Sequence, residues 1–310
     1  MTLADDAVRN VNRRLSRGRP AAAGTSAFRR PRSRQRDRPG RHVVRGVGLA
    51  VIAVVFAYPM IWLVLGSLKT PSTFFANLWG VPARPDFSNY VEAWETGRIG
   101  QYMVNSAVVS LFTLAIVLAT ALPLSYVLAR VRFRGGNALL AVFAITLFLP
   151  MQLLVIPLYE LESNLGLINT YWALILPYSA GALPFAVVFG TTYMRTLPRE
   201  LDEAARIDGC NTLQIFLRVI APLARPAIAT MVVMTFLSIW NEFVLALTVT
   251  QSDGVRTLPV GLLNFSQQFG GTNYPQLFAA LVVSTLPILV VFLVMQRQFV
   301  RGLVDGAVRG

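Results

Sequence analysis

Six apolar stretches, each long enough to cross a bilayer, constrain this chain more than any other feature. About 20 consecutive apolar residues cross the hydrocarbon core as a helix, and lipid offers no partner to the backbone groups of an open strand. Hydrophobic residues make up 55% of the sequence and charged residues 14%, which is a membrane composition. We therefore predict an all-α membrane protein with six transmembrane helices. The stretches cover roughly residues 47–68, 104–129, 138–159, 172–194, 227–250 and 277–296.

The basic residues predict the orientation of these helices. Of the 28 Lys and Arg residues, 24 lie before the first stretch, between the second and third, between the fourth and fifth, or after the last. Only Lys69, Arg84, Arg98 and Arg256 fall in the alternate loops. Because loops on the cytoplasmic side carry the excess of Lys and Arg, we expect both termini to be cytoplasmic.

The two ends of the chain are predicted to be tails flanking a membrane domain at 47–300. Residues 1–46 contain 13 basic and 3 acidic residues with scattered Pro and Gly, so we expect a disordered basic cytoplasmic tail that touches anionic lipid. Nucleic-acid binding is the alternative, but Phe28 is the only aromatic residue among the arginines, and no nucleic acid is expected as a partner. Residues 301–310 are predicted to be a C-terminal cytoplasmic tail.

Several kinds of chemistry are excluded by residue counts. Cys210 is the only cysteine and His42 the only histidine, so an intrachain disulfide and a metal site built on Cys and His are both excluded. A phosphate-binding loop needs Gly-Lys-Ser/Thr, and the only lysine, Lys69, stands after Leu68. The chain therefore cannot hydrolyse ATP by that route, and we expect it to have no catalytic residue, no metal and no cofactor and not to be an enzyme.

A water-facing elbow at 196–226 separates the fourth and fifth stretches. Acidic residues at Glu200, Asp202 and Glu203 suit the positive end of a short helix. Gly209 stands where that helix would end, a position that favours a left-handed conformation. The sequence therefore predicts a first amphipathic helix that ends at a glycine.

A second short helix is expected after this glycine. Asn211 or Thr212 can cap it. An apolar stripe follows at i, i+3, i+4 and i+7, which would tie the helix to the bundle. The stripe consists of Leu213, Phe216, Leu217 and Ile220.

This elbow resembles the Glu-Ala-Ala loop of the integral-membrane subunits of binding-protein-dependent ABC importers. The motif here is Glu203-Ala204-Ala205, then Gly209, then Pro222. The segments 238–243, 257–262 and 296–310 resemble the sugar-transport branch, most closely the maltose type. Ala221 departs from the leucine that is usual before this proline. The similarity covers roughly residues 45–310.

The resemblance implies a type I ABC importer permease fold with a cytoplasmic coupling-helix loop, in a bacterial cell membrane. It implies that the loop docks in a cleft of an ATPase subunit and that the C-terminal tail contacts the ATPase pair. The implied partners are a second permease subunit, two ATPase subunits that bind ATP and Mg²⁺, an extracytoplasmic sugar-binding protein and membrane lipid. The residues implied in ATPase coupling are Glu203, Ala204, Ala205, Asp208 and Gly209.

Glu242 is the only acidic residue inside a predicted span, and an ionisable group at that depth is costly unless it faces a cavity or a partner. Trp240 and Asn241 beside it could stack on a sugar ring and bind its hydroxyls, which makes these three residues candidates for a substrate pathway. Alternatively, Asn241 and Glu242 pair across the interface with the second permease subunit. A capping or interfacial role is a third interpretation.

The leading hypothesis is half of a sugar-import permease, driven by conformational change rather than by catalysis in this chain. One alternative is a permease for another solute, such as a glycerol phosphate or a polyol. Another is a self-contained secondary transporter or channel. That alternative predicts several intramembrane charges and an internal repeat, whereas the sequence has one such acidic residue and no clear repeat.

Overall fold

The computed structural model describes residues 39–268 and 273–308, and in these ranges it contains helices and no strand, as predicted. The long helices are α2 (Pro39–Ser67), α5 (Ile99–Arg130), α8 (Trp172–Thr196) and α15 (Tyr274–Val308). The shorter elements are α3 (Pro71–Ala76), α4 (Ser88–Glu95), α6 (Gly136–Thr146), η1 (Met151–Leu154), α7 (Val155–Asn164), α9 (Glu200–Ile207), α10 (Thr212–Ile215), η2 (Phe216–Ile220), α11 (Ala221–Leu223), α12 (Arg225–Trp240), α13 (Val244–Val249) and α14 (Leu258–Gln268).

Helix α2 contradicts the predicted end of the N-terminal tail. It starts at Pro39, so residues 39–46 are helical, and proline suits the first position of a helix because its missing N–H has no partner there. Residues 1–38 of the predicted tail lie outside the described residues. The chain divides into a unit that ends at Val55 and a unit that begins at Phe56, and the helices from α3 onward belong to the second.

The C-terminal tail predicted at 301–310 is a continuation of α15 as far as Val308. Residues 309–310 lie outside the described part of the chain. No turn separates the last apolar stretch from the basic residues that follow it, so α15 is longer than the predicted span at 277–296.

Four described helices are long and apolar enough to span a membrane, and six spans result if each of two bent pairs is one span. The first bent pair is Gly136–Thr146 with Met151–Asn164, at 89°. The second is Thr212–Leu223 with Arg225–Trp240, at 74°. The first pair covers the predicted span at 138–159. The second joins the second helix of the elbow to α12, which begins the predicted span at 227–250.

The third predicted span, at 138–159, is broken by a proline. The helix α6 ends at Thr146, and helical structure resumes at Met151 after Pro150. A residue that precedes proline is biased away from helical backbone angles, and proline has no N–H to donate. These properties of proline account for the break at Pro150. The sequence did not show which of the prolines in the predicted spans would break a helix.

The fifth predicted span, at 227–250, is also discontinuous. It begins as α12 at Arg225, stops at Trp240, and resumes as α13 at Val244. The break contains Glu242, whose carboxylate accepts hydrogen bonds from the first turn of α13. The interruption is therefore built around the one acidic side chain of this stretch.

The bundle core forms where α5, α8 and α12 meet. Gly190 on α8 lies so close to α5 that a Cβ atom there would stand 2.6 Å from Ser125 Oγ and 2.6 Å from Met231 Cε of α12. Ser125 Oγ donates a 3.2 Å hydrogen bond to the carbonyl of Val187. Small residues let helix backbones approach closely in lipid, where apolar burial between helices provides little driving force.

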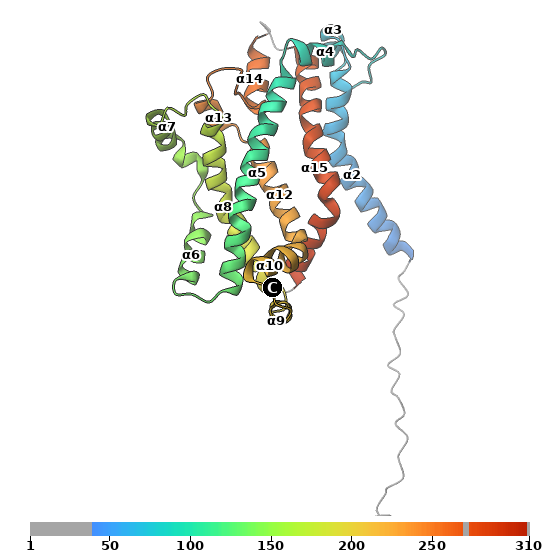
Figure 1. Cartoon of the computed structure of the whole chain (residues 1–310). Coiled ribbons are helices and arrows are strands. Elements are labelled where there is room, and N and C mark those ends of the chain that lie inside the picture. Colours follow the sequence, from blue (N-terminus) through green and yellow to red (C-terminus); the bar gives the residue numbers. More distant parts are fainter. Residues whose placement is uncertain (1–38, 269–272, 309–310) are drawn as a thin grey trace, which may run out of the picture. The chain divides into compact units, whose positions relative to one another are not determined.

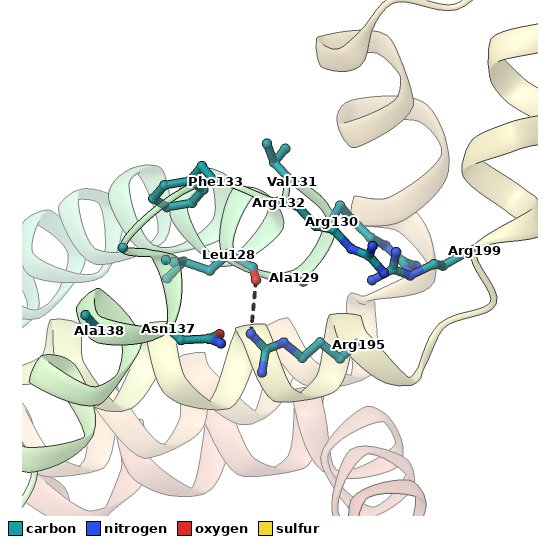
Figure 2. Close-up of a pocket in the computed structure, with 12 residues that line it drawn as sticks. Leu128, Ala129, Arg130, Val131, Arg132, Phe133, Asn137, Ala138, Arg195 and Arg199 are labelled. Atoms are coloured by element: carbon teal, nitrogen blue, oxygen red, sulfur yellow. Dashed lines mark hydrogen bonds between the residues drawn. The ribbon is translucent and has the colours of Figure 1, made fainter.

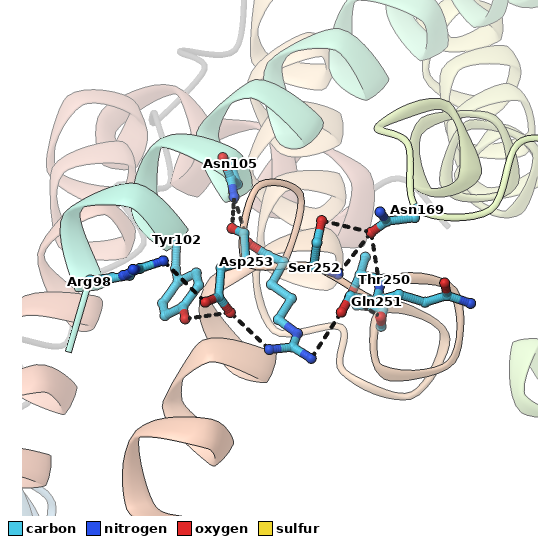
Figure 3. A network of polar contacts seen from close by, with 10 residues as sticks. Arg98, Tyr102, Asn105, Asn169, Thr250, Gln251, Ser252 and Asp253 are labelled. Atoms are coloured by element: carbon cyan, nitrogen blue, oxygen red, sulfur yellow. Dashed lines mark hydrogen bonds and ion pairs between the residues drawn. The ribbon is translucent and has the colours of Figure 1, made fainter. Parts of the chain in front are cut away.

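A polar network holds one end of this bundle together (Figure 3). The Asp253 carboxylate, in the loop after α13, pairs with Arg98 at 3.2 Å and Arg256 at 2.8 Å, and it accepts a hydrogen bond from Tyr102 at 3.1 Å. The Asn169 side chain, which precedes α8, accepts hydrogen bonds from the backbone of the same loop. This end is thus tied across three segments, and the elbow at α9 and α10 lies at the opposite end (Figure 1).

Candidate functional site: the elbow and a small cavity

The first helix of the elbow forms as predicted. The first turn of α9 carries Glu200, Asp202 and Glu203, which complement the positive end of the helix dipole. Gly209 follows the helix with φ +82°, the predicted left-handed conformation. A Cβ atom on Gly209 would meet nothing within 4 Å. In this chain the backbone conformation, and not crowding, therefore favours glycine.

The second helix is capped by Asn211, one of the two predicted candidates. Its side chain accepts a 2.9 Å hydrogen bond from the Gln214 backbone N–H, and the Gln214 side chain accepts one of 2.9 Å from the Asn211 N–H. This reciprocal capping box satisfies two backbone donors that a helix start leaves free. The chain direction after the glycine is therefore set by local hydrogen bonds.

The predicted apolar stripe of the second helix is partly wrong. Leu213 and Leu217 are 64% and 55% exposed, while Ile215, Phe216 and Ile220 are buried. The cause is the π-helical segment η2, in which residues five apart share a face. Ile215 and Ile220 thus point into the bundle together, which a regular 3.6-residue period does not predict.

An ion pair anchors the elbow to α5. Arg130 Nε lies 3.3 Å from Asp202 Oδ2, with side chains only 6% and 12% exposed. The same arginine donates to the Leu197 carbonyl at 3.1 Å, and the Tyr126 hydroxyl donates to Asp202 at 3.5 Å. The Tyr126 ring also packs on Phe216 at 5.3 Å between centroids. Sequence reasoning identified Asp202 only as a helix-dipole partner and missed this anchor.

The residues with a predicted coupling role gather at the tip of the elbow, but they do not all face outward. Ala205 is 7% exposed and packs beneath the helix, so it anchors the tip. The exposed residues are Glu203, Ala204, Asp208 and Gly209. Ile207 beside them is 87% exposed, the highest value for a large apolar side chain among the described residues.

Sequence reasoning missed Ile207. Its signal was available, because it stands three residues after Ala204 and therefore shares the exposed face of α9. A single exposed apolar residue needs no explanation, but one at the tip of an anchored, otherwise polar helix is what a docking surface presents. We therefore add Ile207 to the candidate site.

A small cavity of about 380 Å³ lies at the break between α12 and α13. Asn241 and Glu242, two of the candidate pathway residues, line it. Its further lining residues are Met151, Gln152, Tyr178, Gly181, Ala182, Ser238, Ile239, Phe243 and Val244. The cavity therefore joins the breaks in the third and fifth spans, which the sequence places far apart.

Both oxygens of the Glu242 carboxylate accept hydrogen bonds from within the chain. It accepts hydrogen bonds from the backbone N–H groups of Leu245 at 3.0 Å and Ala246 at 3.3 Å, and from the Tyr178 hydroxyl. The capping role, the third interpretation of this residue, is therefore present in the structure. A carboxylate at a helix N-terminus is favourable because it meets free N–H donors and the positive end of the dipole.

Trp240 does not share this cavity. Its side chain is 4% exposed, donates to the Ser284 carbonyl at 3.3 Å and stacks on Phe236 at 5.2 Å. It is therefore not placed to stack on a sugar ring in this conformation. Asn241 is exposed, lines the cavity and donates to the Leu237 carbonyl at 2.8 Å.

For a permease of the kind that the sequence resembles, Glu242→Ala is expected to lower uptake without abolishing assembly. The change leaves the Tyr178 hydroxyl and the Leu245 and Ala246 N–H groups without an acceptor, at about 1–3 kcal/mol for an unsatisfied group. Uptake kinetics and co-purification of partner subunits measure the two effects. Glu160→Ala, at an exposed position of α7, is the matched control. Unchanged uptake kinetics in the Glu242 variant would remove it from the pathway.

Residues 121–305 match the family model described as binding-protein-dependent transport system inner membrane component. The chain is 35% identical to the probable ABC transporter permease protein YurM of Bacillus subtilis, over 89% of this chain and 93% of that protein. It is 35% identical to the arabinooligosaccharides transport system permease protein AraQ of Bacillus subtilis, over 84% and 93%. It is 34% identical to the diacetylchitobiose uptake system permease protein NgcG of Streptomyces coelicolor, over 84% and 87%. These relatives are transport permeases and not enzymes.

A solved structure shares the fold. It is a bacterial ABC transporter involved in the import of alginate, and the match has a TM-score of 0.74 and covers 84% of this chain and 96% of that one. The sequence identity is 24%, so the similarity concerns the fold alone. The predicted permease fold is confirmed by this match.

Proposed function

The chain belongs to the family of binding-protein-dependent transport system inner membrane components, and from this premise we propose that it is one permease subunit of an ATP-driven sugar importer. It would form half of the translocation pathway, with ATP and Mg²⁺ bound by the partner ATPase subunits. Two of the relatives described above are named for oligosaccharide uptake, which supports a sugar as the transported class. A permease for a polyol or a glycerol phosphate is the second outcome that an uptake assay would reveal.

The observation that carries this proposal is the elbow. Its tip exposes Ile207 and Gly209, while the Arg130–Asp202 pair and the buried Phe216 tie its base to the bundle. A rigid helix that is exposed at its tip and held at its base moves with the helices to which it is tied. Displacement of the tip by a partner would therefore reach α5 directly, as alternating access requires.

The partners follow from the same arrangement. We propose that each of two ATPase subunits receives one coupling loop, the second loop coming from a second permease subunit. An extracytoplasmic binding protein would deliver the sugar at the opposite end, where the Asp253 network lies. In this orientation the elbow and both termini are cytoplasmic, in agreement with the distribution of basic residues.

Gly209→Val should reduce binding-protein-stimulated ATP hydrolysis and uptake about 5- to 30-fold. A β-branched side chain resists φ +82°, and a left-handed residue costs about 1–2 kcal/mol, which the elbow can relieve only by changing its angle. Gly209→Asn should stay near wild type, since asparagine tolerates this conformation. The measurement is made on the importer reconstituted in proteoliposomes with its partner subunits.

Gly166→Val is the matched control, because this glycine also has positive φ, +67°, and an open surrounding, but it lies outside the elbow. Equal losses in the Gly209 and Gly166 variants would mean that the effect comes from general strain and not from coupling. Normal stimulated hydrolysis in Gly209→Val would contradict the coupling role of the elbow.

A further inference from the structure

A pocket of about 730 Å³ opens beside the elbow, between the end of α5, the loop that leads to α6, and the end of α8 (Figure 2). It is separate from the cavity at Glu242 and from the exposed tip of α9. Its lining residues are Leu128, Ala129, Arg130, Val131, Arg132, Phe133, Gly135, Gly136, Asn137, Ala138, Arg195 and Arg199.

Four arginines and no acidic residue line this pocket. Arg130 is paired with Asp202, which lies outside the lining, and Arg195 donates to the Leu128 carbonyl at 3.2 Å. Arg132 and Arg199 have no hydrogen-bonding or ion-pair partner for their side chains among the described residues. A guanidinium group has five N–H donors, so the pocket holds many more donors than acceptors.

Apolar groups adjoin these charges. Val131 and Phe133 are each 44% exposed, although both are large apolar residues. The helix α6, which begins at the pocket, has no buried side chain and exposes Val142 at 59%. A small soluble anion gains nothing from such neighbours, whereas a ligand with both an anionic group and an acyl chain contacts both kinds of surface.

We propose that this pocket binds the phosphate of an anionic phospholipid, with the headgroup on Arg132 and Arg199 and the acyl chains along α6. Basic pockets between the cytoplasmic ends of membrane helices are suited to anionic lipid headgroups, and guanidinium groups bind phosphate oxygens in a bidentate manner. The assignment to the cytoplasmic leaflet rests on the proposed orientation. Arg130 lines the pocket and also forms the ion pair with Asp202 that anchors the elbow. A bound lipid would therefore lie beside that ion pair.

The test is native mass spectrometry of the purified full-length chain with added dioleoylphosphatidylglycerol. Loss of one arginine that binds the headgroup should weaken binding about fivefold, so Arg132→Gln and Arg199→Gln should each do so. Arg134→Gln is the matched control, because this arginine lies in the same loop, is exposed and does not line the pocket. It should leave binding unchanged.

Two further arms identify the ligand. Dioleoylphosphatidylcholine should bind more weakly than dioleoylphosphatidylglycerol, because the phosphatidylcholine headgroup has no net charge. Millimolar inorganic phosphate should not displace the bound dioleoylphosphatidylglycerol. Equal binding of the two lipids, efficient displacement by phosphate, or an equal effect of Arg134→Gln would each overturn the proposal. If Arg132→Gln binds the lipid normally but no longer co-purifies with the ATPase subunit, the pocket would instead be assigned to a carboxylate of that subunit. The mass measurement needs no transport activity, so it stands apart from the test of the proposed function.

Discussion

Ile207→Asp is expected to weaken co-purification of the chain with its ATPase subunit about 30-fold or more. Ile207 is 87% exposed in this chain, so its replacement should leave the fold intact. In the proposed complex the side chain enters a cleft of the ATPase subunit and loses its water. An anchor of this kind contributes about 2 kcal/mol or more, and a buried carboxylate without a partner adds a further penalty.

The measurement is the dissociation constant of the ATPase subunit from the purified permease pair. Ile207→Val keeps an apolar side chain and should bind within a few-fold of wild type. Val81→Asp makes the same chemical change at a residue that is 72% exposed at the opposite end of the bundle, and it should have no effect. Wild-type affinity in Ile207→Asp would show that docking does not use this residue.

Arg130→Met should release the base of the elbow. Among the described residues, the change leaves the Asp202 carboxylate, with a side chain 12% exposed, only the Tyr126 hydroxyl at 3.5 Å as a hydrogen-bonding partner. Removing one partner of a buried ion pair costs about 3–5 kcal/mol of stability, because the remaining charge is uncompensated. The equilibrium between the elbow held against the bundle and the elbow released from it should therefore shift toward the released state by about 150-fold or more.

Cys210 reports this opening. It is the only cysteine, it is partly buried, and it packs against the buried cluster beneath the elbow. The rate of maleimide labelling should rise in Arg130→Met and fall again in the double variant with Asp202→Asn, which removes the unpaired charge. Arg206→Met, at an exposed position of α9, is the control and should label like wild type. An unchanged rate in Arg130→Met would mean that the ion pair does not anchor the elbow.

The local features of the elbow could be read from the sequence because each depends on residues a few positions apart. The left-handed Gly209 follows from its place after a short helix. The capping box of Asn211 and Gln214 closes over three residues. The acidic first turn of α9 needs only the helix dipole. These interactions are short-range, so the sequence predicted the glycine conformation, the acidic first turn and Asn211 as one of two possible caps; the reciprocal bond from Gln214 was not predicted.

The breaks in the spans could be predicted only in part. Pro150 was visible, but prolines at other positions, such as Pro123 and Pro184, lie inside continuous helices. Whether a proline bends a helix or breaks it depends on what satisfies the freed backbone groups. The break between α12 and α13 contains no proline; there Glu242 accepts hydrogen bonds from the backbone of α13, and its partners include Tyr178 on α8. That information is absent from the local sequence.

The sequence by itself determined the helical class, the approximate positions of the apolar stretches, and the start and the glycine end of the first elbow helix, because these depend on composition and on neighbours within one or two turns. The tertiary structure decided which face each helix buries. It moved Ala205 inward, left Ile207 and Leu213 outside, paired Arg130 with Asp202 and buried Trp240 away from the cavity. The physical reason is that burial and ion pairing join residues far apart in the chain, and no local pattern specifies such partners.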